Sequence, residues 1–232
     1  MKNFNIHNVL KKYWGFKSFR TKQEAIINDV LIQKDTLALL PTGGGKSICY
    51  QIPALVKEGM CIVISPLVAL MKDQTIKLQK RNIKAIAITG GLNQHELDIA
   101  LDNCIYGNIK LLYVSPERLE SDLVRERIKK MNVNLIAVDE AHCISQWGYD
   151  FRPSYLKIAE IRALKPESPI LALTATATKK VAKDIQDKLL FKKQNVIQNS
   201  FKRPNLAYMA LEESHKSTRV HKILQKIKGP AI

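Results

Sequence analysis

At 232 residues, 46% of them hydrophobic, the chain has the composition of a soluble globular protein, and no signal peptide, membrane partner or bilayer-spanning run is expected. Lysine and arginine total 37 against 21 acidic residues, and the formal net charge of +16 indicates a polyanionic partner, with nucleic acid ahead of membrane lipid. The four cysteines are widely spaced without a Cys-x-x-Cys pair, which predicts no zinc site and no disulfide framework and favours reduced thiols in the cytoplasm.

Residues 8–33 show a mostly helical pattern that is broken at residues 14–20. Thr21 is predicted to cap the helix that follows, because Glu24 lies three positions later and completes a capping box. A short apolar strand is predicted next, over residues 37–40.

Residues 40–47, with the sequence LPTGGGKS, join this strand to a helix predicted to end near residue 56. A loop almost bare of side chains lets backbone N–H groups converge on an anion, assisted by the helix dipole. Lys46 is then expected to reach the terminal phosphates of a nucleotide, and the Ser47 hydroxyl to be a ligand of Mg²⁺. Leu40 departs from the usual phosphate-loop pattern, which has glycine at that position. The alternative is a flexible glycine-rich turn.

The rest of the chain alternates between short apolar strands and helices. Strands are predicted at residues 61–65, 85–89, 110–114, 135–138, 170–173 and 195–197. Helices are predicted at residues 67–79, 93–103, 154–164 and 179–190, with Asn93 as the cap of the second. A further helical segment is predicted after Ser115-Pro116 and ends at residue 130. This alternation predicts an α/β fold, with a mostly parallel sheet and helices on both faces. Ligands bind at the carboxyl ends of such strands, where the glycine loop, Ser65, Ser115, Asp139 and Thr174 all fall.

Two acidic residues directly follow the strand at 135–138. We assign Asp139 to Mg²⁺, held through a coordinated water, and Glu140 to general-base catalysis on the attacking water. A solvated acidic turn is the alternative. His142 is predicted to be a hydrogen-bonding link rather than a metal ligand, because no second His or Cys sits at ligand spacing.

The loop over residues 143–153, CISQWGYDFRP, alternates Trp147, Tyr149 and Phe151 ahead of Arg152. Aromatic faces stack on unpaired bases and arginine holds phosphate. Because the loop lies beside the acidic pair, we predict that it contacts DNA; anchoring of the core is the alternative.

Small hydroxyl residues and a change of composition mark the end of the chain. Thr174 and Thr176 are predicted to hydrogen-bond the acidic strand end or phosphate, with a turn and helix cap as the alternative. From residue 201 the sequence becomes polar and charged, and residues 202–205 are predicted to be a boundary. We expect one domain over residues 1–205, and a linker with the start of a second, truncated domain over 206–232.

Together these segments resemble the RecQ family of superfamily 2 DNA helicases. The resemblance runs from about residue 13 to 205 and is carried by residues 40–47, 65–74 (SPLVALMKDQ), 115–119 (SPERL), 139–153 (DEAHCISQWGYDFRP) and 172–176 (ALTAT). It implies a RecA-like P-loop lobe that uses ATP and Mg²⁺. It also implies an ATP-hydrolysing 3′-to-5′ motor that moves on single-stranded DNA and unwinds partly duplex DNA.

The resemblance further implies roles for particular residues. Residues 14–23 look like the family's adenine-recognition motif, with Gln23 on the adenine edge, Phe16 stacking and Arg20 in the same pocket. Residues 65–74 and 115–119 look like segments that touch the DNA backbone. The candidate nucleotide-binding residues are then Phe16, Arg20, Gln23, Thr42, Gly43, Gly44, Gly45, Lys46 and Ser47, and the candidate residues for DNA contact and coupling are His142, Gln146, Trp147, Phe151, Arg152, Thr174 and Thr176.

One departure from the family concerns the second lobe, which supplies the arginine finger and half of the DNA track and has no counterpart before Ile232. We therefore expect a first lobe that binds Mg-nucleotide and, weakly, DNA, and that unwinds poorly by itself. Three alternatives remain: an RNA-directed superfamily 2 helicase, a small-molecule kinase with the same phosphate loop, and a non-catalytic, nucleotide-gated binding module.

Overall fold

The structure, a computed structural model, describes residues 5–148, 150–200, 206–207 and 209–227. The chain divides into two compact units, residues 1–200 and 201–232, and the second contains helix α9 (Lys216–Lys226). Tyr149, the boundary predicted at residues 202–205 and the last five residues lie outside the described part. In the described ranges, no helix has the length and apolar character needed to cross a membrane.

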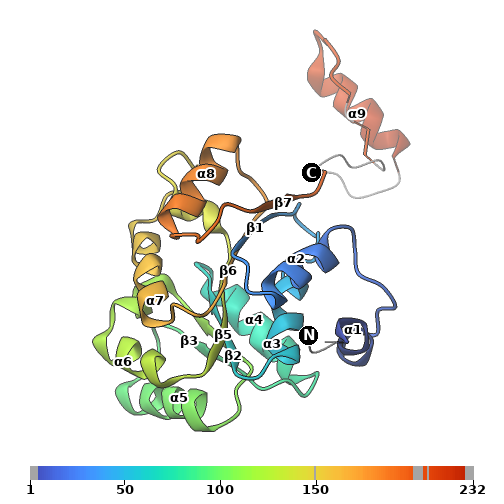
Figure 1. Cartoon of the computed structure of the whole chain (residues 1–232). Coiled ribbons are helices and arrows are strands. Elements are labelled where there is room, and N and C mark those ends of the chain that lie inside the picture. The colour runs from blue at the N-terminus through green and yellow to red at the C-terminus, as the bar shows by residue number, and fades with distance from the viewer. Residues whose placement is uncertain (1–4, 149, 201–205, 208, 228–232) are drawn as a thin grey trace. The chain divides into compact units, whose positions relative to one another are not determined.

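The first unit is built on a parallel sheet, which has seven strands within the described residues, in the order β3-β4-β2-β5-β6-β1-β7 (Figure 1). The strands are β1 (Thr36–Leu39), β2 (Met60–Ile64), β3 (Ala85–Ile88), β4 (Leu111–Val114), β5 (Val133–Val138), β6 (Ile170–Thr174) and β7 (Val196–Gln198). The central strands are buried on both faces, which is why they are continuously apolar in sequence. The predicted α/β fold with a mostly parallel sheet is confirmed.

Helices cover both faces of this sheet (Figure 1). One side carries α1 (Ile6–Trp14), α2 (Gln23–Leu31), α3 (Ile48–Val56) and α4 (Val68–Gln79), with α1 packed on α2 and α3. The other side carries α5 (Gln94–Tyr106), α6 (Asp122–Lys130), α7 (Ile158–Leu164) and α8 (Lys179–Lys188). The described residues also form the short 3-10 helices η1 (Pro116–Glu120), η2 (Ala141–Ile144) and η3 (Pro153–Lys157). Side chains alternate along each strand, so Leu37 and Ala38 belong to opposite cores.

Two predicted helix caps had different outcomes. Asn93 caps α5 as predicted: its side-chain oxygen accepts from the Glu96 N–H at 2.9 Å, and the Glu96 carboxylate accepts from the Asn93 N–H at 2.9 Å. The capping box predicted for Thr21 and Glu24 is wrong. Lys22 occupies the cap position of α2 in the left-handed conformation, with φ 72°, and no side chain caps the helix.

The side chain of Gln23 explains the difference at α2. Its Oε1 accepts from the Arg20 N–H at 2.8 Å, and the Gln23 N–H donates to the Arg20 carbonyl oxygen at 3.1 Å. These two bonds close a turn over residues 20–23, so the chain enters α2 through that turn. Glu24 is instead used across the surface, where its carboxylate pairs with His7 at 2.9 Å.

Because all the strands run in the same direction, their carboxyl ends lie along one edge of the sheet. The glycine loop follows β1, Ser65 follows β2, Ser115 follows β4, Asp139 follows β5, and Thr174 ends β6. The chemistry-bearing residues of the sequence are thereby gathered at one edge.

Candidate active site

The glycine loop has a backbone that other residues do not fit. Gly43 and Gly45 have φ of 77° and 75°, in the left-handed region that favours glycine. A Cβ on Gly44 would lie 2.7 Å from the Pro41 carbonyl oxygen, and one on Gly45 would lie 2.4 Å from Nε2 of Gln23. The three glycines are therefore needed by the path of the loop.

This loop presents backbone donors to one point. Among the described residues, no acceptor takes a hydrogen bond from the N–H groups of Gly43, Gly45, Lys46 or Ser47. Helix α3 begins directly afterwards, and its cap residue Ser47 makes no side-chain capping bond to the backbone. Unpaired N–H groups at a helix N-terminus are suited to a phosphate group.

Leu40 stands where the usual phosphate-loop pattern has glycine, and it remains part of the strand layer. Its side chain is buried in the core beneath α2 and α3, and its N–H donates to the Thr174 carbonyl oxygen at 3.1 Å. The turn thus starts only after Leu40, and the departure from the pattern leaves the glycines that follow it unaffected.

Lys46 and the two acidic residues lie at the same cavity, which has a volume of about 650 Å³. Nζ of Lys46 is 3.3 Å from Oε1 of Glu140. Glu140 has φ of 47°, which is uncommon for a residue other than glycine and is the kind of strained backbone that occurs at functional sites. Asp139 is fixed on both sides of its peptide, because its N–H donates to the Ile64 carbonyl oxygen at 2.8 Å and its carbonyl oxygen accepts from the Tyr155 hydroxyl at 3.0 Å.

Burial, and to a lesser extent the charge on Glu140, raise the pKa of the Asp139 carboxyl to about 6, although Lys46 acts in the opposite direction. The ammonium group of Lys46 therefore does not balance both carboxylates. Oxygen ligands are what Mg²⁺ prefers, and the Ser47 hydroxyl and both carboxylates line the same cavity. The residues present fit a bound Mg²⁺.

The Asp139→Asn substitution is expected to stabilise the nucleotide-free protein at pH 8. The pKa of Asp139 is raised from 3.8 to about 6 on folding, so the protonated carboxyl contributes stability that is fully present below pH 4 and is lost as the pH rises through 6. Above pH 6 the ionised carboxylate therefore lowers the free energy of unfolding by roughly 3 kcal/mol. Asparagine removes this cost and keeps the acceptor for the Glu140 N–H, which lies 3.0 Å from Oδ1. Urea unfolding should show a gain at pH 8 that falls to about half at pH 5.

Asp73→Asn is the matched control, because Asp73 is exposed and pairs with Lys77 within α4. Its effect should be small and the same at both pH values. A gain for Asp139→Asn that does not depend on pH would contradict the assigned burial of a charged Asp139.

The predicted adenine-recognition residues Phe16, Arg20 and Gln23 line the same cavity. Phe16 is 52% exposed, so its ring is available for stacking. Gln23 is buried, and its Nε2 donates to the Gly45 carbonyl oxygen at 3.0 Å, while Arg20 donates to the Gly43 carbonyl oxygen. In this conformation Gln23 and Arg20 support the glycine loop, and their contact with adenine stays a prediction.

His142 forms the hydrogen-bonding link that was predicted for it. Its Nδ1 lies 2.9 Å from the Thr174 hydroxyl and 3.4 Å from Oε2 of Glu140. Burial lowers the pKa of His142, which favours the neutral ring. Thr174 Oγ1 also accepts from the Thr176 N–H at 3.2 Å. The end of β6 is thus connected to the carboxylate of Glu140 through one imidazole.

The aromatic loop lies beyond this link. Trp147 is 63% exposed, and Nζ of Lys180 from α8 lies 3.1 Å from the centroid of its ring. Phe151 is half-buried, with Lys188 5.9 Å from its ring. Gln146 is exposed on the same loop. One exposed aromatic face among lysines suits an unpaired base with its phosphate.

Arg152 ties this loop to the neighbouring strand ends. Its Nη2 lies 3.2 Å from Oδ2 of Asp150, and its Nη1 lies 3.5 Å from the carbonyl oxygen of Pro66, which follows β2. The Ser154 hydroxyl donates to Glu117 of η1 at 3.1 Å. Arg152 of the loop thus contacts one of the two segments that resemble DNA-backbone contacts, and Ser154, directly after the loop, contacts the other.

Three contributors were not anticipated from the sequence. Tyr155 supports Asp139, Lys180 covers Trp147, and Gln74 of α4 lines the nucleotide-sized cavity. Gln74 lies in the segment 65–74, which the sequence pointed to for DNA rather than for nucleotide. Tyr155 and Lys180 gave no signal, because one is a core residue and the other is one of many surface lysines.

Comparison with known proteins also assigns the sequence to the helicases. Residues 20–185 match the DEAD/DEAH box helicase family. The chain is 42% identical over 233 residues to the probable ATP-dependent DNA helicase RecS of Bacillus subtilis, covering 98% of this chain and 46% of that protein. It is 45% identical over 209 residues to the ATP-dependent DNA helicase RecQ of Haemophilus influenzae, covering 90% and 34%. A putative ATP-dependent RNA helicase of Acanthamoeba polyphaga mimivirus is 42% identical over 203 residues, covering 87% and 37%.

Solved structures show the same fold at lower identity. The helicase MrfA has a TM-score of 0.68 to this chain, with 17% identity, over 98% of this chain and 38% of its own. The chain spans between about a third and a half of the length of the relatives named above. Since the family match covers most of the chain and the glycine loop, the acids and His142 share one edge of a parallel sheet, the chain belongs to the DEAD/DEAH box helicase family.

Proposed function

We propose that this chain is the ATP-binding motor lobe of a RecQ-like 3′-to-5′ DNA helicase, which couples Mg-ATP hydrolysis to movement on single-stranded DNA and to unwinding of duplex DNA. The observation that carries the proposal is the single cavity lined by Lys46, Ser47, Asp139 and Glu140. Its volume of about 650 Å³ is within the range of small-molecule sites. Similarity to RecS and RecQ over 90% or more of the chain supports the substrate class.

The glycine loop binds the phosphates in this proposal. The N–H groups of Gly43, Gly45, Lys46 and Ser47 donate to the phosphate oxygens, and the ammonium group of Lys46 turns from Glu140 towards the terminal phosphate. Phe16, which lines the same cavity, stacks on the adenine.

Ser47 and Asp139 would hold Mg²⁺, Asp139 through a coordinated water. The bound ion supplies neutralisation of the charge that develops on the phosphates. Glu140, once Lys46 pairs with phosphate, is left to accept a proton from the attacking water. Ionised Asp139 is needed to take up the ion, so binding of Mg-nucleotide should weaken as the pH drops below about 6.

The link from hydrolysis to DNA runs through His142. The ring lies between Glu140 and Thr174, and the next segment carries Trp147. Stacking of an unpaired base on Trp147 would displace Lys180 and shift the loop that begins at His142. We propose that this movement changes the position of the Glu140 carboxylate through its contact with His142.

The lobe by itself is expected to bind nucleotide and to hydrolyse and unwind poorly. An arginine finger from outside these residues contributes about 10³- to 10⁵-fold to turnover in related phosphoryl-transfer proteins. Tests of activity are therefore made on the full-length protein.

In the full-length protein, single-stranded DNA is expected to stimulate ATP turnover more than single-stranded RNA of the same sequence, and Trp147→Ala to remove most of that stimulation. Loss of one stacked base costs about 1–3 kcal/mol, so the DNA concentration for half-maximal stimulation should rise about 5- to 150-fold. Steady-state turnover as a function of DNA and RNA concentration measures both effects.

The control is Tyr106→Ala, which removes an aromatic ring that is 78% exposed on α5, away from the loop. It should leave stimulation unchanged. Equal or stronger stimulation by RNA would favour the RNA-directed alternative, and full DNA stimulation in Trp147→Ala would rule out the stacking role of that residue.

A further inference from the structure

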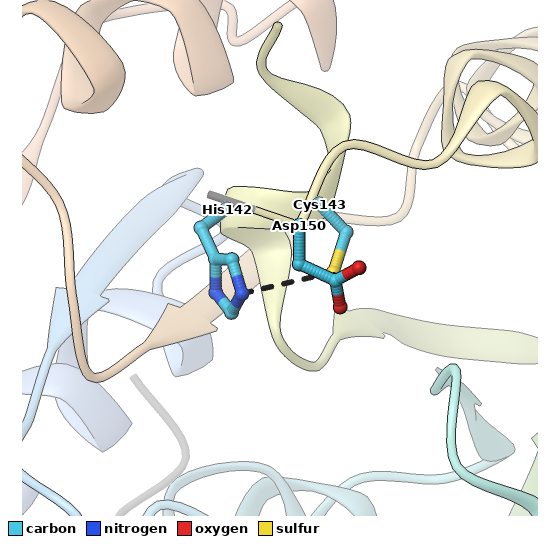
Figure 2. A group of neighbouring side chains, drawn as sticks. All are labelled: His142, Cys143 and Asp150. Carbon is cyan, nitrogen blue, oxygen red and sulfur yellow. Dashed lines mark hydrogen bonds between the residues drawn. The ribbon is translucent and has the colours of Figure 1, made fainter. Parts of the chain in front are cut away.

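Three potential metal ligands meet behind the catalytic acids. Figure 2 shows the side chains of His142, Cys143 and Asp150 beside one another, with a dashed line from the imidazole to the Cys143 thiol. One ligand atom from each lies within 4.8 Å of the other two. His142 and Cys143 are buried in η2, whereas Asp150 arrives from the aromatic loop. The group was not expected from the sequence, because neighbouring residues and a carboxylate seven positions later do not form a familiar ligand spacing.

The separations are close to those of a tetrahedral zinc site. Sγ of Cys143 lies 3.8 Å from Nε2 of His142 and 3.7 Å from Oδ2 of Asp150. With Zn–S near 2.3 Å and Zn–N or Zn–O near 2.0–2.2 Å, tetrahedral angles give ligand separations of about 3.6 Å. These two pairs therefore need to close by only about 0.1–0.2 Å. The third pair, His142 with Asp150, lies within 4.8 Å and has to close further to complete a tetrahedral site.

Nε2 of His142, the nitrogen that would bind the metal, faces the Cys143 thiol. The hydroxyl of Thr174 donates to the Thr176 carbonyl oxygen at 3.3 Å, so its oxygen is the acceptor towards Nδ1 of His142. Oε2 of Glu140, 3.4 Å from the same nitrogen, is also an acceptor. Nδ1 thus carries the proton, and Nε2 directs its lone pair towards Cys143. Metal-binding histidines are commonly oriented in this way by an acceptor at the second nitrogen.

We propose that His142, Cys143 and Asp150 form a binding site for a divalent transition-metal ion, with Zn²⁺ as the best match. Nitrogen, sulfur and oxygen donors in one small site suit Zn²⁺ better than Mg²⁺ or Ca²⁺, which prefer oxygen alone. Three protein ligands leave the fourth position to water. On binding, the Cys143 thiol loses one proton to solvent and forms the Zn–S bond, and thiolate and carboxylate together balance the two charges of the ion.

The site would connect two parts of the coupling region. Asp150 already accepts from the guanidinium group of Arg152, which also donates to the Pro66 carbonyl oxygen. An ion held by His142, Cys143 and Asp150 would fasten the aromatic loop to the segment that follows the catalytic acids. This inference concerns metal binding by the chain and does not depend on the proposed DNA-linked activity.

The test uses the metal-free 232-residue chain without nucleotide. Titration with ZnCl₂ is expected to show one equivalent bound with release of one proton, and titration with CoCl₂ to give a thiolate-to-cobalt charge-transfer absorption band. Cys143→Ser and Asp150→Asn should each weaken Zn²⁺ binding by more than 100-fold, and Cys143→Ser should abolish the band. Thr174→Ala, which changes only the support of the imidazole, should weaken binding about 10- to 100-fold.

Cys104→Ser is the matched control, because Cys104 is a buried thiol on α5 that belongs to no such group within the described residues. It should bind Zn²⁺ and Co²⁺ as the unaltered chain does. Thermal unfolding of each variant without metal checks that the fold is kept. Unchanged Zn²⁺ affinity in both Cys143→Ser and Asp150→Asn, or a cobalt band that is lost only in Cys104→Ser, would overturn the proposal.

Discussion

Replacing Glu140 with glutamine is expected to reduce ATP turnover of the full-length protein by about 10²- to 10⁴-fold, which is the usual contribution of a general base. The amide has nearly the same shape and can still accept a hydrogen bond from Lys46, which lies 3.3 Å from Oε1. The negative charge and the ability to take a proton are lost. Nucleotide affinity, measured by equilibrium binding of a fluorescent ATP analogue with Mg²⁺, should therefore remain close to that of the unaltered protein.

Glu126→Gln serves as the control, because Glu126 is an exposed residue of α6 that pairs with Lys129. It should alter neither turnover nor binding. Should Glu140→Gln keep substantial turnover, another group must deprotonate the water, and the assignment of the base to Glu140 is wrong. A loss of binding together with turnover would instead indicate that Glu140 helps to hold the nucleotide.

Lys46→Ala is expected to weaken Mg-ATP binding by about 10- to 150-fold, because a hydrogen bond to a charged group contributes about 1.5–3 kcal/mol. Lys46 is mostly buried, so neither solvent nor a neighbouring lysine replaces its charge. Its loss also removes the charge that lowers the pKa of Asp139, so that pKa should rise above its value of about 6. Calorimetric titration with Mg-ATP at pH 7 and pH 8 measures both effects.

The affinity lost in Lys46→Ala should be partly recovered at pH 8, where Asp139 is more fully ionised. Lys80→Ala, at the exposed end of α4, is the control and should bind as the unaltered protein does. If Lys46→Ala binds Mg-ATP with unchanged affinity, the glycine loop is not the phosphate site.

Much of the fold follows from local pattern. Buried parallel strands must be apolar on both faces, so the runs at β2, β5 and β6 were recognisable without tertiary information. Asn93 was a recognisable cap because the box with Glu96 is closed within four residues. Thr21 and Glu24 offered the same local pattern, yet Gln23 is held by the glycine loop more than twenty positions away, and that contact decided how α2 begins.

The residues of the candidate site likewise divide into those recognisable from local sequence and those that depend on contacts with distant residues. The strand-loop-helix around Lys46 and the acids after β5 are each local signals, and the rule that ligands bind at the carboxyl ends of parallel strands predicts that they meet. The engagement of Gln23 with Gly45, the raised pKa of Asp139 and the support from Tyr155 depend on burial and on distant neighbours. No spacing along the chain carries that information.

By itself, the sequence determined the fold class, the phosphate loop and the acidic pair, since each arises from contacts between residues near one another or from the direction of parallel strands. Only the tertiary structure decided which groups share a cavity with Lys46, and that Asp150 returns to His142 and Cys143. The physical reason is that the ligand geometry depends on how the loop after η2 folds back against the strand ends. That fold is set by packing and hydrogen bonds between elements, which a single sequence does not display.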